Sequence, residues 1–115
     1  MDYKFRIAGI PTVLDLSYTA KRSIADNGLN ADLVRHTVMD AHRWLALQAP
    51  GSVIAISDSM LGYTAVCGIS EFDASAETPE LQVTVVTVIP ETGANLYLKR
   101  NVKALYEVNN KEEIG

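Results

Sequence analysis

The longest amphipathic pattern in the chain runs over residues 31–48. Apolar residues recur there at the three- and four-residue spacing of one helix face, and charged residues occupy the other faces. The apolar positions are Leu33, Val34, Val38, Ala41, Leu45 and Ala46. Asn30 precedes the pattern as a candidate N-cap, and Ala49, Pro50 and Gly51 end it. The pattern therefore predicts one helix over residues 31–48.

A shorter strand and a shorter helix are expected before it. Residues 12–17, TVLDLS, alternate in side-chain character as a strand does. Ser17 is then in position to cap a helix whose body reads YTAKRSIADN. Gly28 closes this helix, because glycine adopts a left-handed conformation without steric cost.

The second half of the chain has the two-residue period of β-strands. The segments SVIAIS, from Ser52, and YTAVCGIS, from Tyr63, are separated by a turn at residues 58–62, and LQVTVVTVI covers residues 81–89. In the last segment one face carries Val83, Val85, Thr87 and Ile89, and the other carries Gln82, Thr84, Val86 and Val88. Apolar residues on both faces predict that this strand lies in the middle of a sheet.

The segment NLYLKRNVKALYEV, residues 95–108, permits two interpretations. It is compatible with a helix through Leu98, Val102 and Leu105, or with a short strand around residues 96–98. We expect the helix, with residues 109–115 as a frayed tail.

These elements define an α+β fold. We expect two N-terminal helices packed on an antiparallel sheet of about three to four strands. The length of 115 residues is that of one ordinary domain, residues 1–115, and the 48% hydrophobic content is that of a folded chain.

The composition of the chain limits the cellular compartment and the partners that we expect. Cys67 is the single cysteine, which excludes an intramolecular disulfide and a cysteine-based zinc cluster and favours a reducing compartment. The N-terminal residues lack the apolar core of a signal peptide, and no stretch approaches the roughly 18 apolar residues of a membrane span. We therefore expect a cytoplasmic protein without a membrane partner.

The net charge of −4 argues against binding nucleic acid by bulk charge. The basic residues are nevertheless clustered, because Lys99, Arg100 and Lys103 lie close together without an acid between Thr92 and Tyr106. With Tyr97 beside them, they are candidates for holding a phosphate group. A solvated basic face explains the same cluster.

The remaining candidates for chemistry have simpler structural explanations. His36 and His42 are six positions apart and do not share one helix face, so we expect solvated or partly packed side chains and no metal site. Trp44 and Tyr63 are able to stack a base but are expected in or at the edge of the core. Cys67 lies mid-strand among apolar neighbours, where inert packing is the better interpretation.

The stretch YTAKRSIADNGLNADLVRHTV resembles the opening of a family of small bacterial and phage domains related to the RelE-like toxins. In this family a strand leads into a helix with the pattern H-A-x-x-R-h-x-x-R-G-h-s, a second helix and an antiparallel sheet, and SVIAIS, YTAVCGIS and VTVVTVIP are similar to that sheet. The resemblance covers about 80 residues and implies metal-independent cleavage of RNA, in which a phosphoryl group is transferred to the neighbouring 2′-hydroxyl.

The family's polar positions are replaced in this chain. Its histidine falls on Thr19 and its two arginines on Ser23 and Asn27. The positions that match are those of packing and capping: Ala20, Ile24, Ala25, Gly28 and Leu29. A scaffold that is kept while its ionisable residues are lost is expected where a fold serves binding instead of catalysis.

Two hypotheses follow. The first is a ribonuclease without cofactor or metal, with RNA as its partner. Its catalytic candidates are Arg22, Thr87 and Tyr97, and its substrate-binding candidates are Lys99, Arg100 and Lys103. The second is a non-catalytic interaction module that binds a host protein or forms a homodimer.

Overall fold

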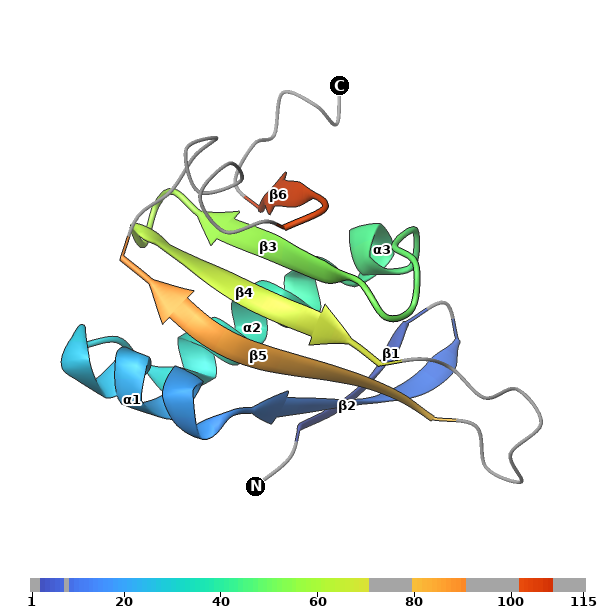
Figure 1. Ribbon diagram of the computed structural model, residues 1–115, viewed down its shortest axis with the longest axis horizontal. Coiled ribbons are helices and arrows are strands. Elements are labelled where there is room, and N and C mark those ends of the chain that lie inside the picture. The colour runs from blue at the N-terminus through green and yellow to red at the C-terminus, as the bar shows by residue number, and fades with distance from the viewer. Residues whose placement is uncertain (1–2, 8, 71–79, 91–101, 109–115) are drawn as a thin grey trace.

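One mixed β-sheet of six strands organises the computed structural model, which describes residues 3–7, 9–70, 80–90 and 102–108. The strands are β1 (Tyr3–Ile7), β2 (Ile10–Leu16), β3 (Val53–Asp58), β4 (Tyr63–Ile69), β5 (Leu81–Ile89) and β6 (Leu105–Glu107). Their order across the sheet is β1-β2-β5-β4-β3-β6. Figure 1 shows how the strands follow one another across this sheet.

The expected antiparallel sheet of three to four strands is wrong. The pairs β1–β2, β4–β5 and β3–β4 are antiparallel, but β2–β5 and β3–β6 are parallel. The parallel pairs arise because β2 and β6 join the outer edges of the β3–β4–β5 meander from distant parts of the chain. The α+β class stands, while the number and direction of the strands are corrected.

The central position of β5 is confirmed, since it lies between β2 and β4. Its side chains do not alternate over the whole strand as expected. The register with β4 shifts between Val66 and Cys67, so that Cys67 lies opposite Val85 and Val66 lies opposite Thr87. Val86 is thus an additional residue in β5, as in a β-bulge, and Val88 joins Val83 and Val85 in the main core.

The predicted helix starts are confirmed by their capping bonds. Helix α1 (Tyr18–Asp26) is capped by Ser17, whose side chain accepts a hydrogen bond from the Ala20 amide. Helix α2 (Ala31–Asp40) is capped by Asn30, which accepts one from the Asp32 amide. No helix in the described ranges has the length and apolarity needed to cross a membrane.

The single helix expected over residues 31–48 is divided in two. Helix α2 ends at Asp40, and a short helix α3 (His42–Leu45) follows, with Ala41 at the junction. Of the predicted apolar face, Val34, Val38, Ala41 and Leu45 are buried. Leu33 and Ala46, at the two ends of that face, are exposed instead.

The main core lies between the helices and one face of the sheet. Buried side chains from α1, α2 and α3 form one cluster with side chains from β1, β2, β3, β4 and β5. In Figure 1, α2 lies across this face of the sheet, and β1 contacts α3. A smaller cluster consists of Ala55, Val66, Ile89 and Val102, with Leu105 packed against it.

The helix expected through Val102 and Leu105 is wrong, because residues 105–107 form strand β6. This strand pairs with β3, and the Tyr106 ring stacks on Trp44 of α3 with centroids 5.2 Å apart. Trp44 therefore lies at the core edge, as expected. The rest of the expected helix lies outside the described residues, except for residues 102–104 and residue 108, which are not helical.

Candidate functional site

Two of the predicted catalytic residues lie near the junction of α1 and β5. The Thr87 hydroxyl is half-buried and lies 3.3 Å from the Ser23 hydroxyl of α1. Arg22 is the residue before Ser23 and is exposed. Ser23 also donates to the Thr19 carbonyl, so the positions where the RelE-like family carries ionisable residues hold uncharged hydrogen-bonding groups here.

Of the predicted substrate-binding residues, Lys103 lies in the described part of the chain, and it is not close to this junction. Lys103 is exposed, and its amide donates to the Val53 carbonyl at the start of β3. Strands β4 and β3 lie between this position and β5, so the distance across the sheet is three strand spacings, or roughly 14 Å. Tyr97, Lys99 and Arg100 lie outside the described residues.

Two other sequence candidates are buried. The Cys67 thiol is fully buried, and burial raises its pKa to about 12, which agrees with inert packing. The Tyr63 hydroxyl contacts the Thr37 hydroxyl and donates to the Leu33 carbonyl. Burial, with the Asp58 and Asp40 carboxylates nearby, outweighs the Thr37 hydrogen bond and raises the pKa of Tyr63 to about 12. Both groups therefore remain protonated near neutral pH.

An apolar cavity of about 170 Å³ opens at the end of the sheet where the β1–β2 turn meets α3. We call it the end cavity. It is lined by Ile7, Ile10, Leu45, Ala46, Gln48, Pro50, Ile69 and Leu81. An engineered cavity of similar volume, roughly 150 Å³, holds one benzene molecule. The end cavity therefore has room for about one aromatic ring or one large aliphatic side chain.

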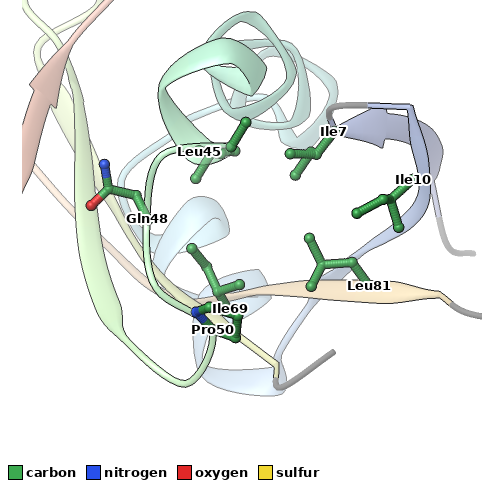
Figure 2. A pocket seen from close by; sticks show the side chains of 8 residues that line it. Ile7, Ile10, Leu45, Gln48, Pro50, Ile69 and Leu81 are labelled. Carbon is green, nitrogen blue, oxygen red and sulfur yellow. The ribbon is translucent and has the colours of Figure 1, made fainter. Parts of the chain in front are cut away.

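The walls of the end cavity are fixed by the fold, while its mouth is open. Figure 2 shows Ile7, Leu45, Ile69 and Leu81 pointing toward a common space. All four side chains belong to the main core cluster. The Gln48 amide points away from this space and donates to the Trp44 carbonyl. Ala46 lines the mouth and is exposed, so the cavity offers an apolar surface that a visiting group can reach.

Both histidines of the chain line a second concavity, a groove of about 320 Å³ between β1 and the α2–α3 junction. We call it the histidine groove. It is lined by Phe5, Arg6, His36, Met39, Asp40 and His42. The four ionisable side chains in it are exposed. The expectation of solvated histidines is thus confirmed, and the fold in addition brings them to one groove with an arginine.

Sequence reasoning missed both concavities, for different reasons. Arg6 and Ile7 belong to a strand that the alternating segment YKFRI signals, and this signal was available. The α2–α3 junction at Ala41 changes the direction of His42 relative to α2, and no sequence pattern announces it. The end cavity takes its lining from four strands, α3 and the loop after α3, so only the assembled sheet reveals it.

Comparison with protein-family models, curated proteins and solved structures finds no match to this chain. The RelE-like resemblance consequently rests on the quoted sequence motifs and stays a prediction.

Proposed function

We propose that this chain is a non-catalytic interaction module that receives one large apolar side chain of a partner protein in the end cavity. The proposal is carried by one observation, an open cavity with buried aliphatic walls and room for about one side chain. Binding energy at protein interfaces concentrates in such pockets, where a single anchor residue is fully desolvated.

The chemistry of the lining limits what the cavity accepts. Its wall atoms come from isoleucine, leucine, alanine and proline side chains, and the one amide, that of Gln48, is turned toward Trp44. A charged or strongly polar group would lose its hydration in the cavity without gaining a partner. A phenylalanine or leucine side chain loses no hydrogen bond there and displaces water that is poorly bonded.

A matched pair of alanines tests the proposal. Ala46 lines the mouth and Ala49 does not, although both are exposed in the same connection between α3 and β3. Ala46 has helical backbone angles of φ −63° and ψ −20°, so a leucine is accommodated there without backbone strain. Ala46→Leu is expected to obstruct the cavity, and Ala49→Leu is the control.

The probe is N-acetyl-phenylalaninamide, a mimic of a single phenylalanine anchor, with N-acetyl-serinamide as the polar comparison. Titration is followed by the methyl NMR signals of Ile7 and Ile69. We expect saturable shifts with the phenylalanine probe alone, at least tenfold weaker binding to Ala46→Leu and unchanged binding to Ala49→Leu. Equal binding to both variants, or an absence of saturable shifts in the wild-type chain, would overturn the proposal.

A homodimer is the second form of the interaction hypothesis, and the same variants distinguish it. If a second copy supplied the anchor, the wild-type chain would sediment as a dimer and Ala46→Leu as a monomer. That result would mean that a second copy of this chain, and not a different protein, supplies the anchor side chain. A wild-type monomer that binds the phenylalanine probe supports a separate partner protein.

Ribonuclease activity is the alternative proposal, suggested by the RelE-like resemblance and by Thr87 lying beside the helix that carries Arg22. It predicts that RNA incubated with the protein and EDTA acquires 2′,3′-cyclic phosphate ends. Arg22→Gln should reduce that cleavage at least tenfold, because removing a cation from a developing phosphoryl charge costs several kcal/mol at most sites of this kind. RNA that stays intact would dismiss this alternative.

A further inference from the structure

We propose that the histidine groove is a binding site for a phosphate monoester or free phosphate. The site is separate from the end cavity and does not depend on the interaction function. It joins residues from three elements: Arg6 from β1, His36 and Asp40 from α2, and His42 from α3.

Two side chains of the groove, His42 and Arg6, are held by hydrogen bonds to backbone carbonyls. The Nδ1 atom of His42 lies 3.0 Å from the Met39 carbonyl oxygen, which is able only to accept a hydrogen bond. Nδ1 therefore carries a hydrogen, and Nε2 is the ring nitrogen that is left to meet a ligand. In the protonated ring this Nε2–H is a charge-assisted donor for a ligand.

Arg6 supplies a permanent positive charge. Its Nη1 donates to the Gly9 carbonyl over 2.9 Å, which holds the guanidinium near the β1–β2 turn. An arginine has five N–H donors, so this bond leaves others for a phosphate oxygen. The half-buried Phe5 also lines the groove, and an aromatic side chain is able to stack with a nucleoside base.

The charge of the groove depends on pH through its histidines. The charged and titratable groups that line it are Arg6 from β1, His36 and Asp40 from α2, and His42 from α3. With both imidazoles neutral, Arg6 and Asp40 cancel and the sum is zero. With both protonated the sum is about +2, which favours an anionic ligand.

The composition of the chain makes the test direct. The sequence contains two histidines, and both line the groove, so every imidazole NMR signal reports on this site. Inorganic phosphate is titrated at pH 6, with ionic strength held constant by sodium chloride. We expect saturable shifts of both imidazoles.

Substitutions of exposed residues separate a built site from general surface charge. Arg6→Gln is expected to weaken phosphate binding at least fivefold, and Asp40→Asn to strengthen it. Arg43→Gln is the matched control, because Arg43 is the exposed neighbour of His42 but does not line the groove. Non-saturating shifts, shifts of one imidazole alone, or equal losses for Arg6→Gln and Arg43→Gln would each overturn the proposal.

A second arm distinguishes the source of the phosphate. Adenosine monophosphate and inorganic phosphate are compared at pH 6 in the wild-type chain. Binding of the nucleotide at least fivefold tighter than inorganic phosphate would assign the site to a nucleoside monophosphate stacked on Phe5. Equal binding would assign it to the phosphate group alone.

Discussion

Ser17 joins the first helix to the middle of the sheet through three hydrogen bonds. Its hydroxyl accepts from the Ala20 amide at 3.0 Å and donates to the Val86 carbonyl at 2.7 Å, and its own amide donates to the Val85 carbonyl. Val86 is the additional residue of the β5 bulge, and its carbonyl accepts the hydrogen bond from the Ser17 hydroxyl. The Ser17 side chain thus caps α1 and also donates a hydrogen bond to a carbonyl at the bulge of β5.

This dual role gives a prediction at the residue scale. Ser17→Ala removes both hydroxyl bonds and should lower the free energy of unfolding by about 2 kcal/mol, roughly 1 for each bond. Asn30→Ala removes a single capping bond, to the Asp32 amide, and should cost about 1 kcal/mol. Urea denaturation of both variants measures the difference.

A third variant separates the two contributions of Ser17. Ser17→Asp keeps an oxygen that is able to cap α1 but places a carboxylate beside the Val86 carbonyl, where the hydroxyl had donated. We expect it to be no more stable than Ser17→Ala. An aspartate variant as stable as the wild-type protein would mean that capping alone accounts for the serine.

At the scale of elements, the sequence predicted what local chemistry decides. The caps at Ser17 and Asn30, the closing Gly28 with φ of 65°, and the turn after β3 were all predicted from residue type. In that turn the Asp58 carboxylate accepts from the Met60 and Leu61 amides, the behaviour expected of a turn aspartate. These features depend only on residues that are close in the sequence, so a local sequence pattern is enough to predict them.

The elements that were missed depend on distant partners. Residues 102–108 have apolar spacing that suits a helix, but the open edge of β3 and the ring of Trp44 stabilise a strand there. The side chains of β5 stop alternating regularly at Val86, and this change likewise follows from the pairing of β5 with β4. The same reason applies to the candidate sites, since no local pattern places Arg6 beside His42 or Ile7 opposite Leu45.

At the scale of the whole molecule, the order of strands predicts how stability is distributed. β5 is bonded on both sides, to β2 and β4, and supplies Val83 and Val85, both fully buried, to the main core. Among the described residues, β1 and β6 are the two edge strands, each bonded on one side, and the side chains of β6 are only half-buried. Strands with one hydrogen-bonded neighbour open locally more readily than strands that are bonded on both sides.

Native-state hydrogen exchange tests this distribution, with the central and edge strands as internal controls for one another. Amides of β5 and β4 that bond to a neighbouring strand should exchange only through global unfolding, so their rates should rise steeply with urea. Bonded amides of β1, and the Val108 amide that follows β6 and bonds to the Ser57 carbonyl, should exchange at least tenfold faster and with little dependence on urea. If the edge amides were as slow as those of β5, the parallel attachment of β6 would have to be part of the cooperative core.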